Sequence, residues 1–282
     1  MERRDGIAGT VRTRDGLELR TLRWPADGEA RAHVLLIHGI AEHAGRHALV
    51  ATRFAQAGIE THAFDLRGFG ASSGRRAYLD RWSQYHDDVE DQLAAIRAVS
   101  GRLPVVLYGH SMGGLIALGY VLANAPRPQS DLLVLSAPAI GANVALWKRS
   151  LADVLGRITP HMEIANDLPP GGLSHDPQVE LAYRSDPLNH HSTTSRLGME
   201  LFHEQARVAS RLAHIAALPL PTYVLHGADD EVVPVSSSAS LEGRPNVTRH
   251  VYAGLRHEMH NEPEAAEVID DTLAWMLARL NT

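Results

Sequence analysis

Short apolar runs recur along the chain, and most of them end at a glycine or a charged residue. They are "HVLLIHG" at 33–39, "IETHAFD" at 59–65, "PVVLYG" at 104–109, "DLLVLSAP" at 131–138 and "PTYVLHGADD" at 221–230. Continuous apolar runs of this length are typical of strands buried on both faces of a parallel sheet. An earlier segment, 10–24, alternates around Asp15-Gly16 and predicts a β-hairpin.

Helix-patterned segments separate most of these runs. The clearest are 46–57, 85–99, 112–125 and 263–280. Strands that alternate with helices indicate βαβ units. The sequence therefore predicts an α/β fold, with a largely parallel sheet and helices on both of its faces.

The alternation stops between about residues 139 and 218. This stretch is helical and irregular, with proline or glycine breaks at 168–172, 175–177 and 185–187. Apolar side chains recur in it at helical spacing, at Trp147, Leu151, Val154 and Ile158. We interpret 139–218 as a mainly helical cap inserted into one core, whose two parts are 1–138 and 219–282.

Composition narrows the class of protein. The 282 residues include no cysteine, which excludes disulfides, thiolate metal sites and a cysteine nucleophile. A formal net charge of −6 without a basic stripe argues against a general nucleic-acid binder. The first residues have no apolar core of a secretory signal, and no apolar run is long enough to span a bilayer. We therefore expect a cytoplasmic protein.

The segment "GHSMG" at 109–113 fits the pattern G-x-S-x-G. The pattern alone is weak evidence, but here a strand-like run precedes it and a helix-like run, "GGLIALGYVLANA", follows. A nucleophile elbow needs this strand–turn–helix context, and its glycines let the strand and helix backbones approach each other. The sequence thus predicts Ser111 as a nucleophile.

A serine hydroxyl needs a base and an orienting acid, which follow in the order Ser, Asp or Glu, His in this architecture. Asp229 comes directly after a predicted strand, and His257 lies on a loop before the last helix. Asp230 is the alternative acid, and we favour Asp229 because it is nearer the strand end. His260 is the alternative base, and we favour His257 because His260 falls at the start of a helix.

Acyl transfer also needs donors for an oxyanion. One is predicted to be the backbone N–H of Met112, which follows the nucleophile. The other is predicted to be the N–H of Ile40, in the loop after "HVLLIHG". Glu42 and Arg46 are expected to stabilise that loop or the start of the helix that follows it.

Seventeen histidines raise the question of a metal site. The pairs His43/His47 and His190/His191 lack a carboxylate at ligand spacing, and the chain has no H-E-x-x-H motif. We expect neither a metal nor a cofactor.

Several motifs together resemble the monoacylglycerol lipase and lysophospholipase branch of the α/β-hydrolases. They are "HGIAEHAGRH" (38–47), "FDLRGFGASSGRR" (64–76), "YGHSMGG" (108–114), "SDPL" (185–188), "HGADDEVVP" (226–234) and "GLRHEMHNE" (254–262). They occur in the order of that family and span nearly the whole chain. The resemblance implies an α/β-hydrolase fold with a mostly parallel eight-stranded sheet, flanked by helices and carrying a cap between the sixth and seventh strands.

The resemblance also implies a triad of Ser111, Asp229 and His257, with oxyanion donors at Ile40 and Met112. Substrates in this branch carry one acyl chain, and the cap supplies an apolar tunnel with a small polar end for glycerol. Glu180 and Tyr183 in "QVELAYRSDP" are the counterparts of the residues that contact glycerol.

Our leading hypothesis is a serine hydrolase that cleaves monoacylglycerols to glycerol and fatty acid. The alternatives are a lysophospholipase, a general carboxylesterase, an aminopeptidase that uses Glu163, Glu180 or Asp176 for the substrate ammonium, and a non-catalytic binding protein. An apolar cap face would suit transient contact with a lipid interface or with a second copy of the chain, so the sequence allows a monomer or a homodimer.

Overall fold

The computed structural model describes residues 2–123, 125–141, 144–166 and 168–280. Eight strands form the central sheet: β1 (Ile7–Arg12), β2 (Glu18–Trp24), β3 (Ala32–Ile37), β4 (Ile59–Phe64), β5 (Val105–His110), β6 (Leu132–Ser136), β9 (Thr222–Gly227) and β10 (Val247–Tyr252). Their order is β1-β2-β4-β3-β5-β6-β9-β10. β2 runs antiparallel to β1 and β4, and the other pairs are parallel. The predicted fold class is confirmed.

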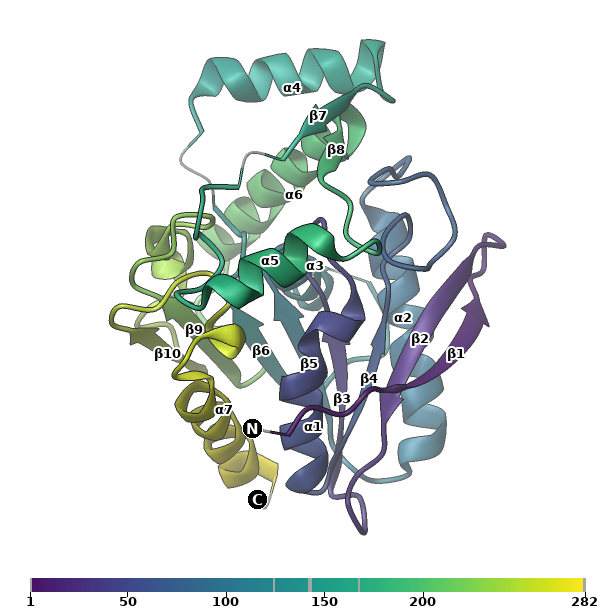
Figure 1. The fold of residues 1–282 in the computed structure, drawn as a ribbon, viewed down its shortest axis with the longest axis vertical. Helices are drawn as coiled ribbons and strands as arrows, with labels where there is room; N and C mark the ends of the chain where they lie inside the picture. The colour runs from purple at the N-terminus through teal and green to yellow at the C-terminus, as the bar shows by residue number, and fades with distance from the viewer. Residues whose placement is uncertain (1, 124, 142–143, 167, 281–282) are drawn as a thin grey trace.

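Side chains of the inner strands point alternately into two apolar layers, which explains their unbroken apolar sequence. On β3, Leu35 and Ile37 face one layer, whereas Val34 and Leu36 face the other. The first layer lies under α2 (Ser83–Ser100) and α3 (Met112–Val121), and the second under α1 (Ala48–Gln56) and α7 (Ala265–Leu280). The sheet therefore has helices on both faces (Figure 1).

The chain between β6 and β9, the sixth and seventh strands of the sheet, forms its own group of elements. They are α4 (Leu146–Ile158), β7 (Glu163–Ala165), α5 (Pro177–Ser185), β8 (Ser192–Thr194) and α6 (Ser195–His214). β7 and β8 pair as a small antiparallel sheet. Figure 1 shows this group over one end of the central sheet, with α4 outermost. Below, "the cap" means these five elements.

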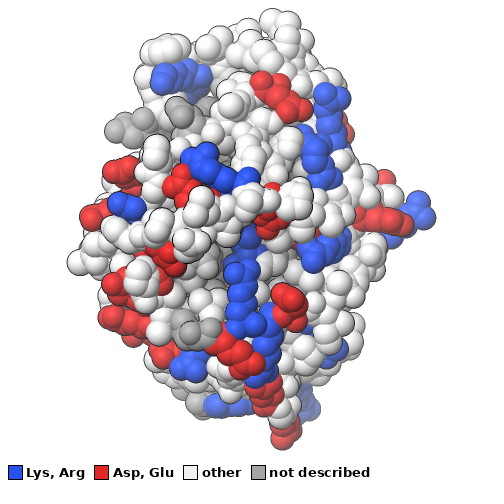
Figure 2. All heavy atoms as spheres, viewed as in Figure 1, with Lys and Arg blue, Asp and Glu red and all other residues white. Residues whose placement is uncertain are grey.

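The outer surface of α4 is apolar. Trp147, Leu151, Val154 and Ile158 are all exposed, with 64% of Trp147 and 74% of Ile158 accessible to solvent. The apolar residues predicted at helical spacing therefore face outward and not into a core. None of the described helices combines the length and the hydrophobicity needed to cross a membrane. Elsewhere on the face shown in Figure 2, basic and acidic side chains are interspersed.

Candidate active site

Ser111 sits at a strained turn between β5 and α3. Its φ of 53° and ψ of −118° lie in a region that residues other than glycine rarely occupy. Backbone hydrogen bonds hold the turn, because Ser111 N–H donates to Ser136 O at 2.9 Å and Ser111 O accepts from Ala139 N–H at 3.0 Å. The side chain is buried and lines a cavity, as a serine on a nucleophile elbow is expected to do.

Three glycines make this turn sterically feasible. A Cβ atom on Gly109 would lie 2.3 Å from the carbonyl oxygen of Gly113, and a Cβ on Gly113 would lie 2.2 Å from that of Ile37. A Cβ on Gly114 would lie 2.8 Å from Cβ of Pro138. The glycines of the motif are thus explained by contacts between β5, α3 and the neighbouring loops.

His257 and Asp230 form a buried pair beside the serine. Nδ1 of His257 lies 2.8 Å from Oδ2 of Asp230, while Oδ1 of Asp230 accepts from the N–H groups of Val232 at 2.9 Å and Val233 at 2.8 Å. Burial disfavours the imidazolium, but the Asp230 carboxylate outweighs it and raises the pKa of His257. The pair has the geometry in which a carboxylate orients a histidine as a general base.

The acid predicted from the sequence is wrong by one position. Asp229 is exposed, and its backbone N–H donates to Leu255 O at 2.9 Å. Asp230 is the buried aspartate that contacts His257. The sequence did contain a signal, because an aspartate that accepts from the N–H groups two and three residues later forms a common turn, and "DEVV" begins with Asp230.

A cavity of about 220 Å³ joins these groups. Ser111, His257 and Ile40 all line it, so the structure brings together three residues predicted from distant parts of the sequence. Met112 is fully buried as the first residue of α3. The loop that carries Ile40 is itself constrained, since Ala41 has a φ of 62°.

A buried ion-pair network fixes the loop of Ile40 against the loop of His257. Oε1 of Glu42 accepts from the Gly39 N–H at 2.6 Å, and its Oε2 lies 3.2 Å from Nε of Arg46. Nη2 of Arg46 reaches both oxygens of Glu258 at 2.6 Å. Glu258 follows His257 directly, so the network ties the proposed oxyanion loop to the histidine. Glu42 and Arg46 were expected from the sequence to stabilise this region, whereas the contact of Glu258 with Arg46 was not anticipated.

Four buried histidine rings contact one another, and two of them, His110 and His257, line the cavity. His110 lies 4.8 Å from His257 and 5.0 Å from His260 between ring centres, and His260 stacks on His47 at 4.6 Å. Burial lowers the pKa of His110 and of His260 well below the usual histidine value. Two of the four rings contact a carboxylate, His257 at Asp230 and His47 at Glu42, and contact with Asp230 raises the pKa of His257.

The two residues predicted to contact glycerol lie apart. Tyr183 is buried, lines the cavity and packs its ring 5.0 Å from the guanidinium carbon of Arg46. Glu180 lies outside the described cavity lining, where it accepts hydrogen bonds from Arg184 at 2.8 Å and from the N–H of Gly171. Only Tyr183 therefore stands where the prediction placed it.

A second cavity, of about 280 Å³, lies within the cap. Its lining comes from α4, β7, β8 and α6 and is largely apolar, with Leu155, Ile164, Leu201 and Phe202. Asn166 lines both cavities, so the apolar space adjoins the cavity of Ser111.

Comparison with known proteins places this geometry in context. A family model described as serine aminopeptidase, S33, matches residues 28–264. A monoacylglycerol lipase of Mycolicibacterium smegmatis is 37% identical over 263 residues, which cover 91% of this chain and 92% of that protein. The crystal structure of a monoacylglycerol lipase of Paleococcus ferrophilus is similar with a TM-score of 0.82 and 27% identity, over 92% of this chain and 98% of the other.

A third similarity concerns the fold alone. The structure of a soluble variant of monoglyceride lipase from Saccharomyces cerevisiae, in complex with a substrate analog, superposes with a TM-score of 0.84 at 22% identity. It covers 96% of this chain and 95% of the other.

Proposed function

The chain belongs to the serine aminopeptidase S33 family of α/β-hydrolases and is an ester hydrolase similar to monoacylglycerol lipases, and we propose that it hydrolyses monoacylglycerols to glycerol and free fatty acid. The observation that carries the proposal is the shared cavity of Ser111 and His257, which adjoins an apolar cavity in the cap. The first would hold the ester carbonyl, and the second would hold an acyl chain.

The proposed reaction follows from the placement of the side chains. Oγ of Ser111 attacks the ester carbonyl while Nε2 of His257 takes its proton, and His257 then returns that proton to the leaving glycerol oxygen. Asp230 keeps Nδ1 of His257 protonated and oriented. Water hydrolyses the acyl-enzyme through the same groups. The N–H groups of Ile40 and Met112 stabilise the negative oxygen in both steps.

The proposed substrate has one chain and a small polar group. We propose that the insertion at residues 139–218, which contains the five elements of the cap, encloses this substrate. The apolar space between α4 and α6 is the proposed site of its acyl chain. Tyr183 supplies a polar group near the ester, because its buried hydroxyl has no hydrogen-bond partner among the described residues. A glycerol hydroxyl in the cavity would satisfy it.

The aminopeptidase alternative requires an acidic group for the substrate ammonium. Glu163 is exposed and accepts from Ser192 at 2.5 Å, and Glu180 is held by Arg184. Glu42 and Glu258 do line the cavity, but Arg46 contacts both. Asp176 caps the N-terminus of α5, where it accepts from the Gln178 N–H at 2.9 Å. Glu163, Asp176 and Glu180 therefore all lie outside the described lining of the cavity, which weakens the aminopeptidase alternative.

Glycerol release from monobutyrin, monolaurin and monoolein tests the proposal, with Ser111→Ala as the control. We expect Ser111-dependent release that is fastest for a medium or long chain. Activity on monobutyrin alone would show that the protein is a general esterase and not a monoacylglycerol lipase. Ser111-dependent activity on lysophospholipids or aminoacyl amides alone would overturn the substrate assignment. A protein that neither hydrolyses any of these nor reacts with a fluorophosphonate would be a binding protein.

A further inference from the structure

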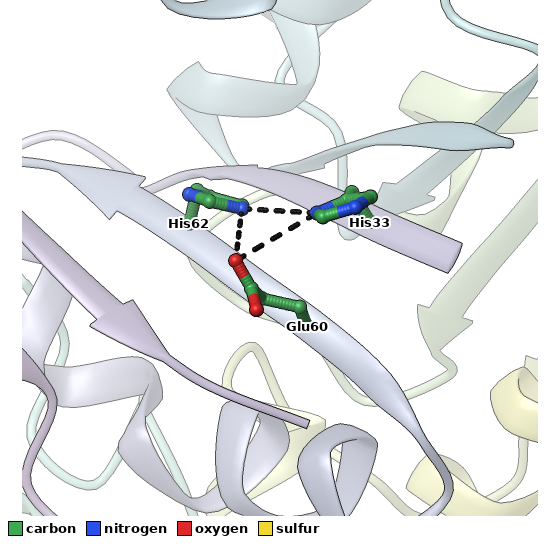
Figure 3. Close-up of side chains that lie close together, drawn as sticks. All are labelled: His33, Glu60 and His62. Atoms are coloured by element: carbon green, nitrogen blue, oxygen red, sulfur yellow. Dashed lines mark hydrogen bonds and ion pairs between the residues drawn. The ribbon is translucent and has the colours of Figure 1, made fainter. Parts of the chain in front are cut away.

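Two histidines and a glutamate meet on β3 and β4, at the end of these strands away from Ser111. Nδ1 of His33 lies 3.2 Å from Nε2 of His62, and Nε2 of His62 lies 3.0 Å from Oε1 of Glu60. The third side of the triangle, from His33 Nδ1 to Glu60 Oε1, measures 3.8 Å. Figure 3 shows the three side chains converging with these atoms toward one another.

These distances match the ligand spacing of a tetrahedral zinc ion. Zinc binds histidine nitrogen and carboxylate oxygen at roughly 2.0–2.2 Å, which places tetrahedral ligand atoms about 3.3 Å apart. The three observed distances, 3.0, 3.2 and 3.8 Å, lie on either side of that value. Imidazole and carboxylate also form a donor set that suits zinc.

Strand geometry holds the ligands in place before any ion binds. His33 on β3 is directly opposite Glu60 on β4, and His62 lies two residues further along β4, on the same face. Arg23 on β2 is paired with His62 and donates to both oxygens of Glu60, at 2.8 and 2.9 Å. Such an outer partner fixes the orientation of a ligating carboxylate. The His62 side chain is 20% exposed, which leaves a path for an ion.

We propose that His33, Glu60 and His62 form a zinc site, with water as the fourth ligand. Among the described residues this is the one group of three potential ligands whose atoms all lie within 4.8 Å of one another. β3 and β4 are neighbours in the sheet, although α1 separates them in the chain. A zinc ion bound here would link the two strands, so its proposed role is structural. Expectations drawn from the sequence concerned the pairs His43/His47 and His190/His191, and they missed this group because strand register assembles it.

Hydrogen bonding provides the competing explanation for the cluster. The proton on Nε2 of His62 can be shared between Glu60 and His33 without any metal. In that case the side chains would bind a divalent ion no better than surface histidines do. Metal binding therefore distinguishes the two explanations.

Titration with Co²⁺, followed by displacement with Zn²⁺, tests the proposal on the full chain. We expect one equivalent of Co²⁺ with the intense visible absorption of a tetrahedral complex, displaced by one equivalent of Zn²⁺. His62→Ala and Glu60→Gln should each weaken Zn²⁺ binding by at least about tenfold. The double variant His190→Gln/His191→Gln is the matched control and should bind like the unaltered chain. Bound Zn²⁺ should also raise the thermal midpoint of the unaltered chain but not of His62→Ala.

Several results would overturn the site: no stoichiometric binding by the unaltered chain, an octahedral Co²⁺ spectrum, or binding that survives both ligand variants. Retained ester hydrolysis shows that each variant is folded. His38 directly precedes Gly39 and Ile40, which line the Ser111 cavity. His33 lies five residues earlier on an extended strand, roughly 17 Å from His38, so metal removal should leave hydrolysis unchanged. Failure of the zinc site is thereby distinguishable from failure of the proposed function.

Discussion

Nδ1 of His257 lies 2.8 Å from Oδ2 of Asp230, whereas Asp229, the residue next to it, is exposed to solvent. Both carboxylates follow β9 in the same turn. Only Asp230 points inward, where the N–H groups of Val232 and Val233 hold its other oxygen. Two chemically identical neighbours therefore have different roles, and each serves as a control for the other.

Asp230→Asn should reduce kcat by about a thousandfold or more, because the amide no longer stabilises the imidazolium or the correct histidine tautomer. Asp229→Asn should change kcat by less than about twofold. The measurement is ester hydrolysis at saturating substrate. Thermal midpoints of both variants establish that the loss arises at the site and not from unfolding. Equal losses in the two variants would contradict the assignment of Asp230.

The pH dependence of hydrolysis should report the His257–Asp230 pair. His257 must be neutral to take a proton from Ser111, so kcat/KM rises with pH as His257 loses its own proton. Because Asp230 raises the pKa of His257 above its ordinary value of 6.5, the midpoint of this rise should lie above pH 6.5. In Asp230→Asn it should move to lower pH. An acid limb that stays in place in the variant would argue against the pair.

Filling the cap cavity should shorten the accepted acyl chain. Gly198 on α6 lines that cavity, and a Cβ there would meet no atom within 4 Å. We expect Gly198→Leu to lower kcat/KM for monoolein by at least about tenfold, the equivalent of about two buried methylenes, with little change for monobutyrin. Ser210→Leu, at an exposed position of the same helix, is the control. Parallel losses on both substrates would show that the chain does not lie there.

Acid should destabilise the protein through its buried neutral histidines. Burial lowers the pKa of His260, so below pH 6.5 the unfolded chain binds a proton that the folded chain does not, and stability falls as the pH falls. His260→Phe removes this proton while keeping an aromatic ring against His47. We expect His260→Phe and the unaltered chain to have similar free energies of unfolding near pH 7.5. On acidification the variant should lose less stability than the unaltered chain, by up to about 1.4 kcal/mol per pH unit. Urea unfolding near pH 7.5 and again below pH 6.5 measures these free energies. The prediction would be contradicted if stability fell equally steeply with pH in both proteins.

Local patterns were sufficient to predict the elbow and the sheet. The turn at Ser111 was predicted because a strand run, a glycine pattern and a helix run meet at one point in the sequence, and the structure has a strained turn there. The inner strands were found because burial on both faces leaves them continuously apolar. Features that depend on residues close together in the sequence can thus be predicted from the sequence.

Contacts between distant segments were not accessible in this way. Glu258 contacts Arg46 across 212 residues, and nothing near either residue indicates the other. His33, Glu60 and His62 become neighbours only through the register of β3 and β4. The choice between Asp229 and Asp230 depended on the direction in which a turn leaves its strand. These three cases share one cause, which is that tertiary pairing decides them.

The walls of the Ser111 cavity hold an excess of negative charge. Glu42, Glu258 and Asp230 are carboxylates buried in or directly behind it, and Arg46 is the one buried guanidinium among the described residues of this network. A neutral ester enters such a space without Coulombic opposition. If the proposed hydrolysis takes place, the newly formed fatty-acid anion would be repelled by the same walls. The electrostatics that hold His257 ready to accept a proton would therefore also hasten the departure of the product and keep inhibition by it weak.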